Sequence, residues 1–427
     1  MNNPINLPSL PIEEYALENG LRVVLSQDEA VPVVSVAVYY DVGSRNEREG
    51  RSGFAHLFEH MMFQGSENVG KTEHFQFIMK AGGTMNGSTS EDRTNYYQTL
   101  PSNQLPLALW LESDRMRSLK VTEENFENQR QVVKEEKRLR YDNQPYINGI
   151  LRLNEMVYKN FANSHSVIGS MDDLDAASVA DVQEFFKTYY APNNAVLSIV
   201  GSFDKTEARQ LVEKFFASIP SQPKPETPNV EEPSEVAVNQ ETFEDKFAPL
   251  PAFLTAWKIP PRSTKDFDAL TLAAKLLFDG DSSRLYQKLV KGEETVAQLF
   301  GSLDERRGPS ALWIGAIPKP DAGLEVIRKS IFNEIEAMST VGVTDEEMTK
   351  LHNGLLNDEI RGRQSSMYRA QRLAEAALYD GNPNVVNTEF QDKLKITKDE
   401  IKTAVATYLN NDNRATIDIV PAKDAKE

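Results

Sequence analysis

The stretch GFAHLFEHMMFQGS, residues 53–66, places His56 and His60 four positions apart, with Glu59 directly before the second histidine. On a helix that turns by about 100° per residue, Glu59 and His60 would lie within about 60° of His56. The opposite side of that helix would carry the apolar residues Phe54, Leu57, Phe58 and Met61. The stretch therefore predicts an amphipathic helix whose polar face brings two imidazoles and a carboxylate together.

Two histidines at positions i and i+4 can direct both imidazoles at one metal ion. A carboxylate one turn away can then reach a water molecule on that ion. The alternative is a helix whose histidines are ordinary, partly exposed residues. A catalytic zinc site needs three protein ligands and an open position, so the metal hypothesis requires one more ligand. The chain has no cysteine, which excludes thiolate ligands, thiol nucleophiles and disulfides and leaves His, Asp or Glu.

The best candidate for the third ligand is Glu136, in the charged helical stretch TEENFENQRQVVKEEKRLRYDN, residues 122–143. The apolar stripe predicted for this helix consists of Phe126, Val132, Val133 and Leu139. Glu136 and Gln129 would point to the same side as the stripe, whereas Glu135 would turn away. A carboxylate on a buried face needs a compensating partner, because an unpaired buried charge costs several kcal/mol. A metal ion would supply that partner, and so would an Arg or Lys from elsewhere in the chain.

The size and charge of the chain limit the classes of protein to which it can belong. The chain has 427 residues, 40% of them hydrophobic, which allows two or more domains. The formal net charge of −17 disfavours binding to a phosphate backbone, so we expect no nucleic-acid partner. No phosphate-binding loop, dinucleotide fingerprint or serine nucleophile elbow is present. The remaining histidines, His74, His165 and His352, lack metal-ligand spacing and are interpreted as structural or surface residues.

The opening MNNPINLPSLPIEEY has neither a basic start nor an apolar run, so it does not resemble a secretory leader. No stretch approaches the roughly 20 apolar residues of a membrane span. We expect a soluble protein. The compartment is unknown: it would be cytoplasmic as written, and periplasmic if a leader was removed before Met1.

The two halves of the chain have similar sequence patterns and are separated by a proline-rich segment. The strand-like VVSVAVYYDVGS precedes the histidine stretch, as AFLTAWKIPP precedes FDALTLAAKLLFDGDSSRL, and a capped helix starting after Ser178 or Thr397 leads to a strand in each half. This predicts an α+β fold of two homologous subdomains, each a mostly antiparallel sheet with helices packed on one face. We expect a catalytic subdomain at 1–219, a linker at 220–245 and a C-terminal subdomain without the metal motif at 246–427.

The motif of His56, Glu59 and His60, followed 76 residues later by Glu136, resembles the inverted-motif (HxxEH) zinc peptidases typified by pitrilysin, insulin-degrading enzyme and the mitochondrial processing peptidase. The resemblance covers nearly the whole chain, including LENGLRVVLSQDEAVPVVSVAVYYDVGSRNE and AGGTMNGSTSEDRTNYYQTLP. The length matches the small members, whose chain is half of a two-subunit clamshell. The resemblance implies that His56, His60 and Glu136 bind zinc (Zn2+) and that Glu59 is the base that activates water.

The stretch GGTMNGSTSEDRTNYY alternates small polar and larger residues after a Gly-Gly break, as an exposed edge strand would. The counterpart in the family pairs with the main chain of the substrate. The resemblance therefore implies that a peptide adds as a strand here, with Asn86, Gly87 and Ser88 contributing. The alternative is a plain surface hairpin.

Two departures from the family pattern bear on activity. Many members have a Glu where this chain has Gln129, which can still form hydrogen bonds beside the metal. Active relatives also carry an Arg and, seven residues on, a Tyr in the second half, where this chain has Val290 and Ala297. Arg284 and Tyr286 have the wrong spacing and are interpreted as packing and surface residues. The chain would then be the metal-bearing subunit of a heterodimer whose homologous partner supplies the Arg/Tyr pair; a homodimer is the other possibility.

The function predicted from the sequence is a zinc metalloendopeptidase that cleaves peptides or unfolded segments inside a two-subunit chamber. The alternative is a non-catalytic scaffold or assembly subunit of the same fold. The intact set of His56, Glu59, His60 and Glu136 argues against a scaffold, which has no need of a metal-activating base. A zinc-dependent hydrolase of other substrates is a third hypothesis.

Overall fold

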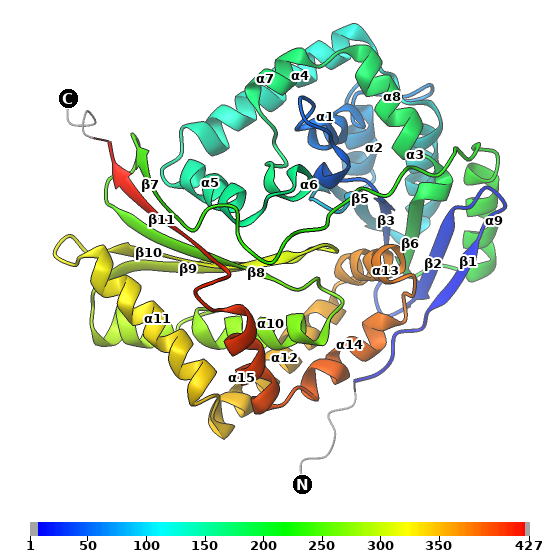
Figure 1. Ribbon diagram of the computed structural model, residues 1–427. Helices are drawn as coiled ribbons and strands as arrows, with labels where there is room; N and C mark the ends of the chain where they lie inside the picture. The colour runs from blue at the N-terminus through cyan, green and yellow to red at the C-terminus, as the bar shows by residue number, and fades with distance from the viewer. Residues whose placement is uncertain (1–6, 423–427) are drawn as a thin grey trace. The chain divides into compact units, whose positions relative to one another are not determined.

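A six-stranded, mostly antiparallel sheet forms the first part of the structure (Figure 1). The computed structural model describes residues 7–422. The spatial order of the first sheet is β1 (Glu13–Ala16), β2 (Arg22–Gln27), β6 (Ala195–Gly201), β3 (Val33–Tyr40), β5 (Thr94–Pro101) and β4 (Thr84–Thr89). Gly20, with a φ of 87°, lies in the turn of the β1–β2 hairpin, a backbone conformation that glycine adopts readily.

A five-stranded sheet forms the second part. Its order is β7 (Gln240–Asp245), β11 (Arg414–Pro421), β8 (Ala252–Ile259), β10 (Ser310–Pro318) and β9 (Val296–Asp304). In each sheet one pair of neighbours is parallel, β2 with β6 and β7 with β11, and every other pair is antiparallel. Apart from the additional β1, the two sheets have the same order and strand directions, which confirms the predicted α+β fold of two similar subdomains.

Both faces of the first sheet are covered by helices. α13 (Ser366–Asp380) lies along one face, where Ala370 and Leu373 pack with Ala37 and Tyr39 of β3. The opposite face is covered by α1 (Phe54–Met61), α2 (Glu73–Lys80) and α3 (Leu105–Ser118). The prediction that helices pack on one face only is therefore wrong for this sheet, because a helix from the far end of the chain buries the apolar residues of the other face.

The second sheet is also covered on both faces. α5 (Ile147–Val157) lies on one face and α11 (Leu324–Thr340) on the other (Figure 1). Leu153 and Met156 of α5 pack against β8 and β11, and the ring of Phe332 in α11 lies 5.8 Å from that of Phe253 in β8. α10 (Lys265–Leu277) and α15 (Lys398–Tyr408) lie on the same side as α11. The remaining α-helices are α4 (Glu123–Lys137), α6 (Phe161–Ser164), α7 (Met171–Ala176), α8 (Val179–Tyr189), α9 (Lys205–Phe216), α12 (Asp345–Gln364) and α14 (Val385–Leu394).

The compact units differ from the predicted segments by two exchanged pieces. One unit comprises residues 7–131, 171–227 and 357–391, and the other comprises 132–170, 228–356 and 392–422. The exchange brings α13 to the first sheet and α5 to the second. The predicted linker at 220–245 holds no helix or strand up to residue 239, but its last six residues form β7 of the second sheet. The assignment of a catalytic subdomain to 1–219 stays a prediction.

The two predicted N-caps are confirmed. Ser178 and Thr397 each accept a hydrogen bond from the backbone N–H three residues on and complete a capping box, at the starts of α8 and α15. Among the described residues, no helix is both long enough and apolar enough to cross a bilayer.

Candidate metal centre

α1 carries the histidine motif, and a carboxylate holds its first turn. The helix begins after Gly53, whose φ of 85° is readily adopted by glycine. Oε2 of Glu47 accepts from the N–H of Gly53 at 2.8 Å, and Oε1 accepts from the N–H of Ala55 at 2.7 Å. Glu47 therefore satisfies two amides that a helix start leaves without partners, and its charge lies at the positive end of the helix dipole.

The apolar face of α1 is buried, as predicted from its periodicity. Phe54, Leu57, Phe58 and Met61 are all buried. The ring of Phe58 lies 4.2 Å from that of Tyr190 and 5.6 Å from that of Phe185, between centroids. This packing fixes the rotation of the helix about its axis, so that His56, Glu59 and His60 share the opposite, partly exposed face.

The buried face of α4 is narrower than the sequence predicted. Phe126, Gln129 and Val133 are buried, whereas Val132 and Leu139 are exposed by 42% and 57%. The predicted apolar stripe was therefore wrong in these two members. The buried residues follow the helical spacing of three and four, and Glu136 continues the same spacing, with 18% of its side chain exposed. Glu135, by contrast, is exposed and pairs with Arg138 at 3.2 Å.

α4 is tied to its surroundings by two side chains. Asn125 Nδ2 donates to the carbonyl of Gln64, just after α1, at 3.2 Å. Arg130, in the middle of α4, donates to the carbonyls of Asp175, at the end of α7, and of Ala177, directly after it, at 3.2 and 3.1 Å. These bonds orient the helix that carries Glu136, which is continuous from Glu123 to Lys137.

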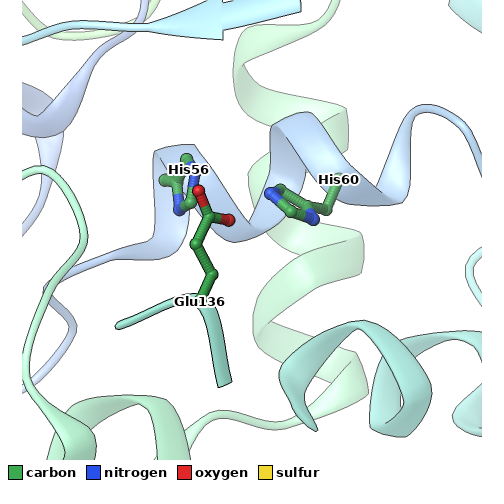
Figure 2. Close-up of side chains that lie close together, drawn as sticks. All are labelled: His56, His60 and Glu136. Atoms are coloured by element: carbon green, nitrogen blue, oxygen red, sulfur yellow. The ribbon is translucent and has the colours of Figure 1, made fainter. Parts of the chain in front are cut away.

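The side chains of His56, His60 and Glu136 come together, as the sequence predicted (Figure 2). One ligand atom from each lies within 4.8 Å of the other two, and within residues 7–422 this is the one group of three or more His, Asp or Glu side chains with metal-site geometry. The imidazole rings lie 4.8 Å apart, between centroids, at 73°.

This donor set fits zinc. Two imidazoles and one carboxylate are one of the three-ligand sets found in catalytic zinc sites, which leave a fourth position open. Around a tetrahedral ion with bonds of about 2.0–2.2 Å, ligand atoms lie about 3.3–3.6 Å apart. The observed spacing of up to 4.8 Å thus needs only a small movement of the side chains.

Glu136 also meets an arginine. Oε1 of Glu136 lies 2.8 Å from Nη1 of Arg140, one helical turn further on, and the Arg140 side chain is 74% exposed. A charge partner for Glu136 was the alternative that the sequence left open, and the structure contains it. Exposed pairs at this spacing contribute only about 0.3–0.5 kcal/mol. Glu136 forms this ion pair while its carboxylate also lies close to both imidazoles.

Glu59 faces the edge of the first sheet. Its Oε2 accepts a hydrogen bond from the hydroxyl of Thr89, on β4, at 2.7 Å. β4 is the terminal strand of the sheet, so the predicted edge strand is confirmed. Asn86 is exposed on this strand, and Gly87 and Ser88 are partly exposed. Their role in binding a peptide stays a prediction.

Gln129 is placed on the buried face of α4, where its Nε2 donates to Oδ1 of Asn128 at 2.8 Å. Its predicted support of the metal centre is untested. In the second half, Val290 lies in the short helix η5 (Tyr286–Gly292), and Ala297 is exposed on β9. Arg284 forms an ion pair with Glu347 at 2.6 Å. The interpretation of Arg284 and Tyr286 as packing and surface residues stays a prediction.

Sequence reasoning missed two residues that support this centre, Glu47 and Thr89. Thr89 stands two positions after Gly87 in the predicted edge strand, so alternation could have placed both on one face of the sheet. Nothing in the local pattern around Glu47 distinguishes it from the neighbouring Glu49.

Comparisons with known proteins find relatives of both halves of the chain. Residues 22–169 match the family model described as insulinase (peptidase family M16), and residues 176–355 match the model described as the peptidase M16 inactive domain. The zinc protease PqqE of Helicobacter pylori is 29% identical over 405 residues, which cover 92% of this chain and 91% of that protein. A probable mitochondrial-processing peptidase subunit beta of Arabidopsis thaliana is 24% identical, over 79% of this chain and 65% of that one.

The solved structure of a protease from Helicobacter pylori superposes with a TM-score of 0.92 at 28% identity, covering 97% of this chain and all of that one. The sequence matches span both halves, and the structural match extends over nearly the whole described fold. The chain belongs to peptidase family M16, the family of pitrilysin-like zinc proteases and processing peptidases.

Proposed function

We propose that this chain is a zinc-dependent endopeptidase and the metal-bearing subunit of a two-subunit enzyme. The observation that carries the proposal is the meeting of His56, His60 and Glu136, with the carboxylate of Glu59 on the same face of α1 as the two histidines. A fold kept only as a scaffold would need neither the three ligands nor the adjacent base.

The proposed roles follow from the chemistry of the side chains. His56, His60 and Glu136 hold the ion. When bound, zinc supplies Lewis acidity, which makes water easier to deprotonate and polarises a peptide carbonyl. Glu59 takes a proton from the attacking water, whose oxygen bonds to the carbonyl carbon. The C–N bond then breaks, and the same proton passes from Glu59 to the amine nitrogen, which returns the carboxylate to its starting form.

The substrate is proposed to bind as an added strand on β4. Among the described residues β4 has no further strand on its outer edge, and the stretch Asn86, Gly87 and Ser88 would pair there with the main chain of a peptide. Main-chain pairing selects extended segments and accepts many side chains. The preferred substrates would therefore be peptides and unfolded stretches of protein, and folded domains would be excluded.

A partner subunit follows from the missing Arg/Tyr pair. Val290 and Ala297 cannot donate side-chain hydrogen bonds to a substrate carbonyl. The Arabidopsis relative is named as one subunit of a processing peptidase, which agrees with a two-subunit arrangement. We propose a homologous partner that supplies the pair, and a homodimer lacking it should be a weak enzyme.

The proposal is tested with a quenched fluorescent peptide, purified wild type and Glu59→Gln, each with its copurifying partner. Hydrolysis by the wild type and its loss in the variant, with equal zinc content in both, is the expected result. Zinc binding without hydrolysis, even with the partner present, would favour the scaffold function. Cleavage of a non-peptide ester or amide alone would favour a hydrolase of another class.

A further inference from the structure

The edge strand β4 presents alternate residues to opposite faces of the first sheet. Gly87 is paired with Tyr96 and Thr89 with Thr94, and both partners on β5 are fully buried. The ring of Tyr96 lies 5.6 Å from that of Phe63, directly after α1, so this is the face that α1 covers. Gly87 and Thr89 therefore face the helix that carries the histidine motif.

Thr89 makes a short, direct hydrogen bond to the proposed base. Its Oγ1 lies 2.7 Å from Oε2 of Glu59, a hydroxyl donor on a carboxylate. Bonds to ionised acceptors are about twice as strong as neutral ones. Threonine is branched at Cβ, which restricts χ1 and gives the hydroxyl a defined direction. The bond thus limits rotation of the carboxylate about the last side-chain torsion of Glu59.

Gly87 leaves room for the other carboxylate oxygen. A Cβ at this position would lie 3.2 Å from Oε1 of Glu59 and 3.1 Å from a ring carbon of Tyr96. That separation is tighter than ordinary van der Waals contact, so a side chain would press against the carboxylate. β4 thus approaches Glu59 at two points: the hydroxyl of Thr89 contacts Oε2, and Gly87, which has no side chain, faces Oε1.

We infer that Thr89 is a positioning residue for Glu59: its hydroxyl holds Oε2 and makes Oε1 the oxygen that accepts the proton of the attacking water. The inference rests on the proposed function of Glu59 as base. β4 would then have two roles: it would align the main chain of the peptide, as proposed above, and it would orient the base Glu59. Peptide and base would be held relative to each other by a single strand.

The test compares Thr89→Val, which keeps the shape and removes the hydroxyl, with Thr89→Ser, which keeps the hydroxyl. Thr206→Val, on the exposed surface of α9, is the matched control. We expect Thr89→Val to lower kcat by about 10- to 100-fold, the range of one hydrogen bond to a charged group, with little change in KM or in zinc per chain. Thr89→Ser should recover most of the rate, and Thr206→Val should match the wild type.

A second measurement separates positioning from substrate binding. In the Glu59→Gln background, adding Thr89→Val should leave the affinity for a fluorescent peptide unchanged, because Thr89 acts through the base and not on the peptide. Thr89→Ala is made alongside, so that a folding defect specific to valine does not decide the result.

Three outcomes would overturn the inference. The first is an unchanged kcat in folded Thr89→Val and Thr89→Ala. The second is a loss of rate that Thr89→Ser does not recover. The third is a fall in peptide affinity or zinc content that is large enough to account for the lost rate. An active wild type with any of these results leaves the proposed function standing. A zinc-loaded wild type that cleaves no peptide would overturn both.

Discussion

Nη1 of Arg140 lies 2.8 Å from Oε1 of Glu136, and a carboxylate oxygen of the same Glu136 lies within 4.8 Å of an imidazole nitrogen of both His56 and His60. The carboxylate therefore has two kinds of partner. The arginine is largely exposed, and its loss would leave Glu136 beside the imidazoles. A metal ion that replaced the arginine contact would also lie beside the two imidazoles.

Removal of the arginine should have little effect on metal binding. Because an exposed pair one turn apart contributes about 0.3–0.5 kcal/mol, Arg140→Ala should change the dissociation constant for zinc by less than about threefold. Competition with a chelator of known affinity measures the dissociation constant for zinc. Arg138→Ala, which removes the same charge from the pair with Glu135, is the control. A tenfold or greater loss confined to Arg140→Ala would mean that the arginine holds Glu136 in place.

Neighbouring glutamates on α4 should differ sharply in their importance for zinc. Glu136→Gln replaces a carboxylate ligand with a neutral amide and should leave the purified protein without stoichiometric zinc after dialysis. Glu135→Gln changes the same kind of side chain on the exposed face and should keep its zinc. Metal analysis and circular dichroism on both variants check the prediction. Equal zinc content in the two proteins would remove Glu136 from the ligand set.

The part of the site that follows helical periodicity could be predicted from the sequence. The spacing of His56, Glu59 and His60 against a buried apolar face is a local property of eight residues, and the structure reproduces it. Glu136 was reached through the same argument, although Val132 and Leu139 proved to be exposed. The stripe includes every apolar residue on one side of the helix, whereas tertiary packing buries only some of them.

Contacts between distant segments could not be predicted in this way. The apolar side of α13 shows that the helix packs on something, but not that it packs on β3, where Ser366 lies 2.8 Å from Ser35 between hydroxyl oxygens. The hydrogen bond from Thr89 to Glu59 has the same character. Alternation along β4 indicates the face on which Thr89 lies, and only the arrangement of α1 on that face decides which side chain it meets.

The carboxylate of Glu47 should stabilise the start of α1. Glu47→Ala removes acceptors for the amides of Gly53 and Ala55, and lost caps of this kind cost about 1–2 kcal/mol. We expect the melting midpoint to fall by a few degrees, at about 2–4 °C per kcal/mol. We also expect zinc to bind more weakly, because the helix that carries the two proposed histidine ligands is less ordered. Glu49→Ala, at an exposed position in the same loop, is the control.

Calorimetry of both zinc-free variants measures the midpoint shift, and chelator competition measures the affinity. Equal midpoints for Glu47→Ala and Glu49→Ala would show that water replaces the cap without cost. A lower midpoint with unchanged zinc affinity would show that the cap stabilises the fold but does not order the ligands.

Buried His74 should make the stability of the protein depend on pH. Burial, with a smaller contribution from the nearby Arg115, lowers the pKa of His74 well below its ordinary value of 6.5, and its Nε2 lies 3.4 Å from Oε1 of Gln98. Below pH 6.5 the unfolded chain binds a proton at this residue that the folded chain does not. Stability is therefore full above pH 6.5 and falls as the pH drops toward the folded pKa, by up to about 1.4 kcal/mol per pH unit.

His74→Gln keeps a hydrogen-bonding side chain that does not titrate, so the wild type should lose more stability than this variant between pH 7 and pH 5. Urea unfolding of the zinc-free proteins at a series of pH values gives the difference. All other titratable groups are the same in the two proteins, so their contribution cancels in the comparison. Parallel stability curves would mean that His74 is protonated equally in the folded and unfolded states, which would contradict its burial as the neutral form.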